Sequence, residues 1–298
     1  MSDVLVTGAT GFAGSHLVDL LRESGAAVTG WRRQDVDLLD RQAVERAIAA
    51  LRPATVFHCA GAAHVGGSWD EARKTMATNV LGTHHLLSGL RSAGVRARVL
   101  IPGSSYVYRQ SEHALKESDP VGPASPYALS KLAQEMLGAR GASDDGQDVF
   151  LTRSFNHIGA RQDPSFAAPG FARQIALIET GRMAPTIAVG NIDAARDFTD
   201  VRDTVRAYRD IVDRGVPGTL YNVCSGRAHK IRDVLDRLIA LSTAPVQVRV
   251  DPERYRPNDN PLLLGDASLI KRDVGWEPTI TLDETLADLL KYWRKEVE

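Results

Sequence analysis

Val4-Leu5-Val6-Thr7-Gly8-Ala9-Thr10-Gly11-Phe12-Ala13-Gly14 decides the fold, because it leads a short apolar run through three glycines into a helix. Apolar residues recur at helical spacing from His16 to Leu21, so the order is buried strand, tight turn, helix. In such a unit one glycine permits the turn, one lets a diphosphate approach the backbone, and one lets the helix pack on the strand. The amides at the start of the helix then bind the anion. A glycine turn without a ligand is the alternative, but the order of elements favours a dinucleotide bound by Gly8, Thr10, Gly11, Phe12 and Ala13.

The composition describes an ordinary globular protein with no bulk attraction to polyanions. Of the 298 residues 43% are hydrophobic and 24% charged, and the formal net charge is −1. We therefore expect neither a nucleic-acid partner nor binding to an anionic membrane, and no apolar run is long enough to span a bilayer. Cys59 and Cys224 lie in apolar runs, which is typical of buried thiols in a reducing compartment. With the first strand at the N-terminus there is no room for a signal peptide, so we expect a cytoplasmic protein.

Strand and helix patterns alternate through the first half of the chain. Expected strands after the first lie at 27–31, 54–60, 98–102 and 148–153, and expected helices at 41–51, about 69–93 and about 126–139. Asp40 is the expected N-cap of the helix over 41–51. Repeated strand–helix units predict an α/β fold, a Rossmann-like doubly wound parallel sheet with helices on both faces.

This alternation stops after Asn156, where loops and prolines become frequent. Beyond it we expect helices at 169–180, about 231–242 and 283–296, a strand at 246–250, and further pieces around 197–213 and 220–223. We interpret the chain as a dinucleotide-binding domain over 1–158, with about 196–224 added, and a smaller, largely C-terminal substrate-binding region over 159–195 and 225–298. The smaller region is expected to lie over the carboxyl ends of the sheet.

Tyr127 and Lys131 are the candidate acid–base pair. They lie four residues apart on an expected helix and so face the same side. A free phenol has a pKa of about 10, and we expect the neighbouring ammonium of Lys131 to lower it. Lys131 could also reach the ribose of a nicotinamide nucleotide. The pair alone is a weak motif, but its place after the fourth strand favours catalysis.

The residues after the second strand bear on the choice of cofactor. An NAD site places an acid there for the ribose hydroxyls, whereas a 2′-phosphate favours arginine. This chain has Arg32 and Arg33, with no acid before Asp35. We therefore expect NADP(H) in preference to NAD(H), with solvated surface charges as the alternative explanation of the two arginines.

The motif from Thr7 to Gly14 resembles that of the extended short-chain dehydrogenase/reductase family. Aligned on the Val-Tyr after the fourth strand, the resemblance implies that Ser104 is the catalytic hydroxyl that hydrogen-bonds the reacting oxygen. It also implies that Asp37 and Leu38 contact adenine and that Ala60 and Ala62 pass the diphosphate. No metal is implied.

Later segments resemble the branch of this family that acts on GDP-sugars, and the resemblance extends over essentially the whole chain. The matching segments are 153–162, 171–175, 189–203, 256–266 and 275–278. The likeness implies a GDP-sugar substrate with contacts from His64, Ser105, Tyr106, Asn156, Arg173, Arg196 and Arg256. Each arginine could instead form a surface salt bridge, Arg196 with Asp197 above all. Ser68 and Asn79 border the site and could be structural.

The resemblance further implies a homodimer formed through the helices at about 69–93 and 126–139. We expect Met76, Val80, Leu86, Leu87 and Leu90 to provide apolar surface beyond what their own sheet can cover.

Tyr106 separates two reactions within that branch. Dehydratases of the family place a glutamate two residues after the catalytic hydroxyl to remove the C5 proton, and here this residue is Tyr106. We therefore expect NADPH-dependent reduction of the C4 ketone of a GDP-4-keto-6-deoxy-hexose. The alternatives are GDP-mannose 4,6-dehydration, another epimerase or dehydratase acting on a nucleotide sugar, and a cofactor-sensing regulatory protein.

Overall fold

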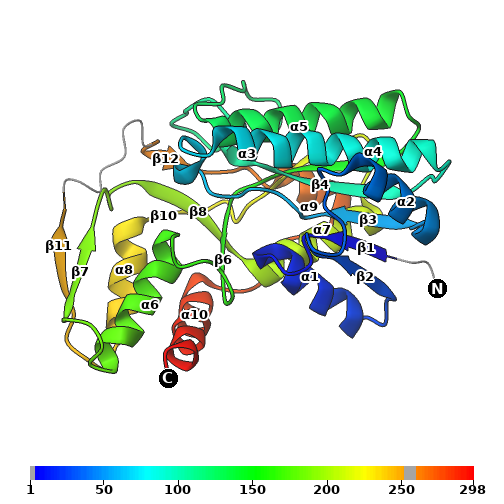
Figure 1. The fold of residues 1–298 in the computed structure, drawn as a ribbon. Coiled ribbons are helices and arrows are strands. Elements are labelled where there is room, and N and C mark those ends of the chain that lie inside the picture. The colour runs from blue at the N-terminus through cyan, green and yellow to red at the C-terminus, as the bar shows by residue number, and fades with distance from the viewer. Residues whose placement is uncertain (1–3, 252–259) are drawn as a thin grey trace.

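A parallel sheet of six strands forms the centre of the molecule in the computed structural model, which describes residues 4–251 and 260–298. The strands lie in the order β2-β1-β3-β4-β5-β9 (Figure 1). They are β1 (Val4–Thr7), β2 (Val28–Trp31), β3 (Thr55–His58), β4 (Arg98–Ser104), β5 (Asp148–Ser154) and β9 (Leu220–Val223). The chain passes from β1 to β2 on one side and then crosses back over β1 to β3 on the other side. In open parallel sheets, such a reversal of direction forms a crevice at the carboxyl ends of the strands. The predicted fold class is confirmed.

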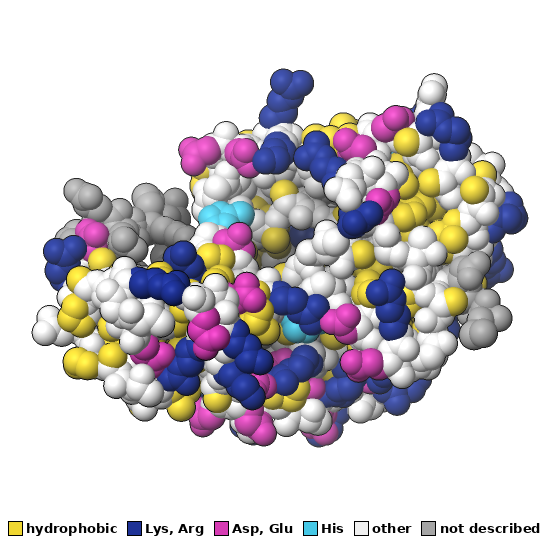
Figure 2. Space-filling model, turned by 60° about the horizontal axis from the view of Figure 1, so that its bottom comes forward, with side chains coloured by type: hydrophobic (Ala, Val, Ile, Leu, Met, Phe, Trp, Pro, Cys, Tyr) yellow, Lys and Arg dark blue, Asp and Glu magenta, His cyan; other side chains and the backbone are white. Residues whose placement is uncertain are grey.

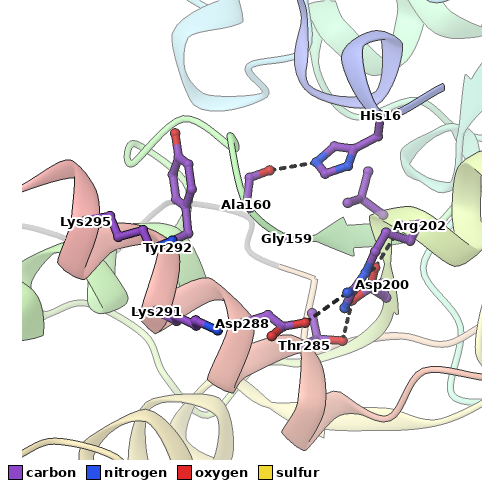
Figure 3. Close-up of a pocket in the computed structure, with 11 residues that line it drawn as sticks. His16, Gly159, Ala160, Asp200, Arg202, Thr285, Asp288, Lys291, Tyr292 and Lys295 are labelled. Atoms are coloured by element: carbon purple, nitrogen blue, oxygen red, sulfur yellow. Dashed lines mark hydrogen bonds and ion pairs between the residues drawn. The ribbon is translucent and has the colours of Figure 1, made fainter. Parts of the chain in front are cut away.

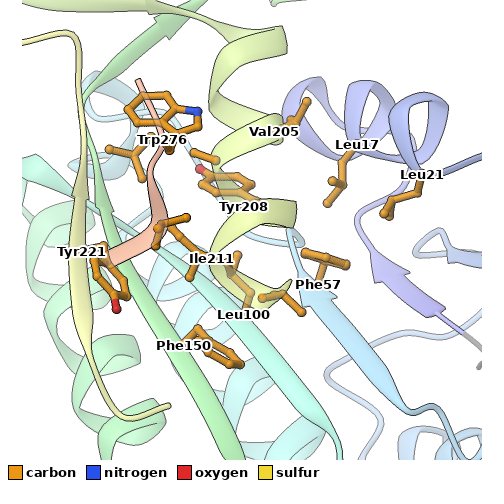
Figure 4. Close-up of a cluster of buried hydrophobic side chains, with 14 of the residues drawn as sticks. Leu17, Leu21, Phe57, Leu100, Phe150, Val205, Tyr208, Ile211, Tyr221 and Trp276 are labelled. Atoms are coloured by element: carbon orange, nitrogen blue, oxygen red, sulfur yellow. The ribbon is translucent and has the colours of Figure 1, made fainter. Parts of the chain in front are cut away.

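Helices cover both faces of this sheet. They are α1 (Phe12–Glu23), α2 (Arg41–Leu51), α3 (Ala72–Met76), α4 (Gly82–Ser92), α5 (Pro126–Ser143), α7 (Val201–Arg214) and α9 (Ser268–Val274). On one face Leu17 of α1 and Tyr208 of α7 pack with Phe57 and Phe150 of the sheet, and Trp276 closes the same cluster (Figure 4). On the other face α2 and α4 cover the strands. Nearly continuous apolar strands are what a parallel sheet buried on both faces requires.

Side-chain caps fix the starts of two helices, α2 and α5. The side chain of Asp40 caps α2 by accepting from the Ala43 amide at 3.0 Å, as predicted. Ser125 caps α5 in the same way through the Ala128 amide, with Pro126 in the first turn. Tyr127 is thereby fixed in the first turn of α5.

A smaller group of elements stands beside the carboxyl ends of the sheet (Figure 1). It contains β6 (Asn156–Ile158), β7 (Thr186–Val189), β8 (Ala195–Asp200), β10 (Ala228–Lys230), β11 (Gln247–Val250), β12 (Leu262–Leu263), α6 (Ala167–Glu179), α8 (Ile231–Ala240) and α10 (Leu282–Glu296). Strand β8 pairs with β6, β10 and β12, while β7 pairs with β11. Helices α6, α8 and α10 share a separate apolar core.

Three features differ from the sequence-based expectations. The helix expected at about 69–93 consists of α3, the π-helical turn η2 (Ala77–Leu81) and α4, and the 3₁₀ turn η1 (Gly66–Ser68) precedes it. A further 3₁₀ turn, η3 (Ser105–Val107), follows β4. Helix α9 was not expected, and it packs in the α1/α7 cluster on the main sheet.

Most of the residues expected to form a second apolar face are buried in the core instead. Leu86, Leu87 and Leu90 are buried in the core between α4 and the sheet. The exposed apolar side chains near this face are Trp69, Leu81, Leu129 and Met136. The expectation was wrong for the three leucines because the inward face of α4 uses them against α2 and the strands.

Cys224 is buried, Cys59 is half-buried, and neither forms a disulfide. Among the helices that the structure describes, none is both long and apolar enough to cross a membrane.

Candidate active site

The glycine turn after β1 has the geometry of an anion cradle. Gly8 has φ +66°, and a Cβ there would lie 2.7 Å from the backbone of Ala60. A Cβ on Gly14 would come within 2.1 Å of the Gly8 oxygen, so only glycine lets α1 start this close to the turn. Gly11 caps α1 without a side-chain hydrogen bond, and no described residue accepts from the amides of Phe12 and Ala13. These open donors at a helix start fit a diphosphate.

The loop after β3 is held against this turn. The Ala60 amide donates to Thr7 Oγ1 at 3.2 Å, and the Ala62 amide donates to Asn79 Oδ1 at 2.8 Å. Asn79 Nδ2 in turn donates to the Ala62 carbonyl and to Ser130 Oγ of α5. Asn79 is therefore a brace between the loop and α5.

A hollow of about 330 Å³ opens beside the turn, lined by Ala9, Thr10, Val18, Arg22, Gly30, Arg32 and Asp35. Arg32 points its guanidinium at Asp35 in a two-bond contact, with both distances 2.8 Å. The Arg32 hydrogen bonds hold the pKa of the Asp35 carboxyl at about 2. Arg33 is mostly exposed and does not line the hollow, nor do Asp37 and the buried Leu38. The hollow can therefore take an adenosine phosphate against Arg32.

Ser104, Tyr127 and Lys131 are brought together where β4 ends against α5. All three are buried, with 5%, 8% and 8% of their surfaces exposed. Ser104 lies close enough to the Tyr127 phenol to lower its pKa, and its Oγ accepts from the Tyr106 amide at 3.3 Å. The ring of Tyr106 meets that of Tyr127 edge-on. The Tyr127 amide donates to Ser68 Oγ at 3.3 Å, which gives Ser68 a structural partner.

Burial dominates the protonation of this group. It raises the pKa of Tyr127 to about 12, although the neighbouring Ser104 opposes the change. Burial also lowers the pKa of Lys131 to about 8. The expectation that Lys131 would lower the Tyr127 pKa is thus wrong for this structure. The Lys131 ammonium donates instead to the Pro102 carbonyl at 2.8 Å and to Gln134 Oε1 at 2.7 Å. Tyr127 is a protonated phenol, suited to donating a proton.

Two residues proposed to bind substrate carry buried oxygens without a partner in the structure. Ser105, 1% exposed, follows β4, and Asn156 follows the adjacent strand β5. No residue that the structure describes forms a hydrogen bond with Ser105 Oγ or Asn156 Oδ1. Because buried polar atoms are normally satisfied, these two invite a ligand at the carboxyl edge of the sheet.

The other residues expected to bind substrate differ in their burial and in the partners they contact. His64 lies against Phe166, with ring centroids 5.3 Å apart, and its Nδ1 accepts from the Gly67 amide. Arg173 is exposed on α6, with its guanidinium over Trp293. Arg196 is buried and donates to the carbonyls of Ala195 and Asn260. Arg256 lies outside the described residues.

Asp197 is not the exposed partner that the sequence suggested for Arg196. Its buried carboxylate accepts from the amides of Ser225, Gly226 and Gly265, so it ties β8 to the chain after β9. Burial raises the pKa of this carboxyl.

A second cavity, of about 290 Å³, lies away from the catalytic group between α1, α7 and α10 (Figure 3). His16 Nε2 contacts the Ala160 carbonyl at 2.9 Å, and Arg202 bridges Asp200 and Asp288 (Figure 3). These contacts join the first helix to the smaller group of elements. Lysines and arginines mingle with acidic side chains on the surface (Figure 2), so any anion site has to be assembled locally.

Sequence reasoning missed three residues near the site. Arg22 on α1 lines the hollow beside Arg32, which no strand-end motif could indicate. The His157 ring stacks on Phe12, with centroids 5.6 Å apart and planes 7° apart. Gln134 binds the Lys131 ammonium, and its spacing of three residues on a helix was the available signal.

The glycine turn, the doubly wound sheet and the Ser104–Tyr127–Lys131 group define an extended short-chain dehydrogenase/reductase. A sequence profile described as GDP-mannose 4,6 dehydratase matches residues 33–289. The chain belongs to that family, which confirms the resemblance seen in the sequence.

Individual relatives span nearly the whole chain. The GDP-6-deoxy-D-mannose reductase of Pseudomonas aeruginosa is 36% identical, over 99% of this chain and 98% of the relative. The GDP-mannose 4,6-dehydratase of Vibrio cholerae is 25% identical, over 96% and 92%.

Solved structures agree with these matches. The structure of RMD from Pseudomonas aeruginosa complexed with NADPH superimposes with a TM-score of 0.91 and 33% identity, covering 99% of this chain and all 100% of the other. A UDP-glucose 4-epimerase from Thermotoga maritima with UDP-glucose has a TM-score of 0.89 and 27% identity, covering 99% of this chain and 100% of its own.

Proposed function

We propose that this protein is an NADPH-dependent reductase of the C4 ketone of a GDP-4-keto-6-deoxy-hexose. The observation that carries the proposal is a protonated Tyr127 next to Ser104, beside a tyrosine ring at position 106 instead of a carboxylate. Reduction of a ketone needs a proton donor and a hydrogen bond to the oxygen. Dehydration additionally needs a base for the C5 proton, and an uncharged phenol is a poor one. The 36% identity to a GDP-6-deoxy-D-mannose reductase points the same way.

The residues fit the dinucleotide. The open amides of Phe12 and Ala13, with Gly8, Thr10 and Gly11, would hold its diphosphate, and Ala60 and Ala62 would flank it. Arg32, with Arg22 behind it, would face the 2′-phosphate in the hollow. The reductase structure from Pseudomonas aeruginosa is a complex with NADPH, which supports this assignment. When bound, NADPH supplies the hydride.

The protein's own groups would control the oxygen at C4. Ser104 would hydrogen-bond the ketone oxygen and polarise it, and Tyr127 would donate its proton to the alkoxide that forms there. Lys131 would orient the nicotinamide ribose through the N–H that Pro102 and Gln134 leave available. With a pKa of about 12 the phenol remains protonated at neutral pH.

The smaller group of elements would bind the GDP-sugar. The unpartnered oxygens of Ser105 and Asn156 would contact the sugar and its diphosphate, and His64 and Tyr106 would border the same site. Arg173, Arg196 and Arg256 remain proposed phosphate or base contacts. Because Arg196 already donates to two carbonyls, its most direct effect would be to shape β8. We propose a dinucleotide-binding domain over 1–158 and about 196–224, and a substrate-binding region over 159–195 and 225–298. Within the latter, residues 268–276 pack on the main sheet.

We also propose a homodimer in the cytoplasm. The exposed apolar side chains of Leu81, Leu129 and Met136 lie on the η2, α4 and α5 face, where water contact is unfavourable. Two unpaired cysteines are consistent with a reducing compartment.

The competing function is GDP-mannose 4,6-dehydration, because the family profile bears that description. Purified protein should be incubated separately with GDP-mannose and with GDP-4-keto-6-deoxy-mannose, each with NADP⁺ and with NADPH, and the products analysed by mass spectrometry. We expect the 4-keto sugar to gain two hydrogens and GDP-mannose to persist. Rapid loss of water from GDP-mannose, with the 4-keto sugar untouched, would make the protein a dehydratase.

A further inference from the structure

Lys131 is buried and charged, and none of the described residues that interact with it electrostatically is a counter-ion. The ionisable groups that interact with it are His58 at the end of β3, Cys59 directly after β3, and His157 in β6, while Tyr127 lies four residues before it on α5. Burial holds Tyr127 and Cys59 protonated, with pKa values of about 12, and lowers the pKa of His58 to about 3 and that of His157 as well. All of these groups are therefore neutral near pH 7. The ammonium depends on two uncharged acceptors, the Pro102 carbonyl and the Gln134 amide.

The orientation of the Gln134 amide follows from the donors and acceptors around it. Thr83 has one hydroxyl proton, and it donates this proton to the Asn79 carbonyl at 2.7 Å. The Thr83 oxygen can then only accept, which it does from Gln134 Nε2 at 2.7 Å. With its Nε2 turned to Thr83, Gln134 must present Oε1 to Lys131.

This pattern of donors and acceptors extends to the cofactor turn. His58 Nε2 lies 2.9 Å from Thr83 Oγ1, so it must be a donor there, which leaves Nδ1 to accept from the Thr7 hydroxyl at 2.9 Å. Thr7 precedes Gly8 of the glycine turn. A buried chain of hydrogen bonds between uncharged side chains thus runs from Thr7 through His58 and Thr83 to Gln134, which accepts from the Lys131 ammonium.

We propose that Gln134 is a positioning residue for Lys131, its amide clamped by Thr83 and His58 so that Lys131 keeps both its charge and a free N–H toward the dinucleotide site. The ribose contact rests on the proposed function, but the effect on the ammonium does not. Gly61 lies beside that group, since a Cβ there would be 3.7 Å from Nζ.

Two substitutions of Gln134 should move the Lys131 titration in opposite directions. Gln134→Glu places a carboxylate on the ammonium and should raise the titration midpoint by about one pH unit or more. Gln134→Met has a similar volume and no acceptor, so the charged form loses a partner and the midpoint should fall. A purely structural role would shift neither midpoint, or both in the same direction.

The measurement is the pH dependence of the Lys131 side-chain carbon signal in cofactor-free protein labelled with ¹³C-lysine, assigned by its absence in Lys131→Arg. The wild-type midpoint should lie at about 8. Gln147→Met is the matched control, because Gln147 is also buried and is bonded to Ala97 and Val95 but not to Lys131. It should leave the midpoint unchanged.

Two substitutions of Thr83 provide an independent test if the Gln134 variants fail to fold. Thr83→Val removes the acceptor that orients the amide and should lower the midpoint, whereas Thr83→Ser keeps the hydroxyl and should restore it. NADPH fluorescence titration should show roughly tenfold weaker binding for Gln134→Met, because a Lys131 that is no longer held in place loses its charged hydrogen bond to the cofactor. Midpoints that do not separate between Gln134→Glu and Gln134→Met, or between Thr83→Val and Thr83→Ser, would overturn the proposal. Opposite shifts without any effect on NADPH would keep the clamp and overturn only its link to the cofactor.

Discussion

The ring of Tyr106 meets the ring of Tyr127 edge-on, with centroids 6.4 Å apart and an angle of 76° between the planes. The two phenols are neighbours with different surroundings, because Ser104 Oγ accepts from the backbone amide of Tyr106 at 3.3 Å but lowers the pKa of the Tyr127 phenol. Tyr127 should therefore donate the proton, and Tyr106 should contribute only to the shape of the site.

Replacing Tyr127 by phenylalanine should remove the proton donor and leave the dinucleotide site intact. We expect kcat for ketone reduction to fall by about a hundredfold to ten-thousandfold, with an NADPH dissociation constant within about threefold of wild type. Tyr106→Phe is the matched control and should retain most of the activity. Stopped-flow absorbance of NADPH gives both quantities. Equal losses in the two variants would mean that Tyr127 is not the donor.

Arg32 and Arg33 should differ in their effect on cofactor choice, since only Arg32 lines the hollow beside the glycine turn. Arg32→Ala should weaken NADPH about tenfold to a hundredfold and NADH by less than about threefold, because a charged hydrogen bond to the 2′-phosphate is lost. Arg33→Ala should change both only slightly. Titrations monitored by nicotinamide fluorescence measure the four constants. A loss shared equally by NADPH and NADH would show that Arg32 does not read the phosphate.

The exposed apolar face should hold two copies of the chain together. Leu129 and Met136 are 49% and 66% exposed on α5, about two turns apart. Leu129→Glu combined with Met136→Lys should convert a dimer into a monomer, as measured by light scattering at micromolar concentration. Leu241→Glu, a change at an apolar side chain that is 41% exposed elsewhere, should leave the dimer intact. A monomeric wild-type protein would refute the proposed assembly.

Glu179 should stabilise the smaller group of elements in a pH-dependent way. Its carboxylate accepts from Arg294 Nε and Nη2 at 2.8 Å and from the Thr243 amide at 2.9 Å, and these hydrogen bonds lower its pKa to about 2. Because the pKa in the folded protein is below the unfolded value, the stabilisation is complete above about pH 4.5 and is lost as the pH falls toward 2.

Glu179→Gln should therefore lower the free energy of unfolding by about 1–2 kcal/mol at pH 7, with the difference shrinking below pH 4.5. Urea denaturation at pH 7, 4.5 and 3 measures this. Glu71→Gln is the control, because its ion pair with Lys74 is 60% exposed on both sides. That change should cost less than about 1 kcal/mol. A Glu179 effect independent of pH would contradict an electrostatic origin.

The main sheet could be predicted from the sequence because each strand is a short apolar run joined to the next by a helix. The smaller sheets could not. Strand β12 has two residues, β6 and β10 have three, and their partner β8 is distant in sequence from β12, so no local pattern marks them. Helix α9 is seven residues long and depends on the α1/α7 core for its stability.

The candidate site was predictable in its groups but not in their protonation. The spacing of Tyr127 and Lys131 placed both on one face of α5, yet only the surroundings show that burial outweighs their mutual effect. Likewise the sequence indicated Arg32 and Arg33 together, whereas the backbone after β2 brings only Arg32 to the hollow.

The most direct test of the central proposal follows the hydride. Purified protein is supplied with GDP-4-keto-6-deoxy-mannose and NADPH deuterated at the transferable position of the nicotinamide, in parallel with GDP-mannose and NADP⁺, and the products are examined by NMR. We predict one deuterium at C4 of a GDP-6-deoxy-hexose, with one NADPH consumed for each product molecule and GDP-mannose left unchanged. An unreacted keto sugar, together with conversion of GDP-mannose to its 4-keto-6-deoxy derivative without net use of NADPH, would contradict the proposed reductase.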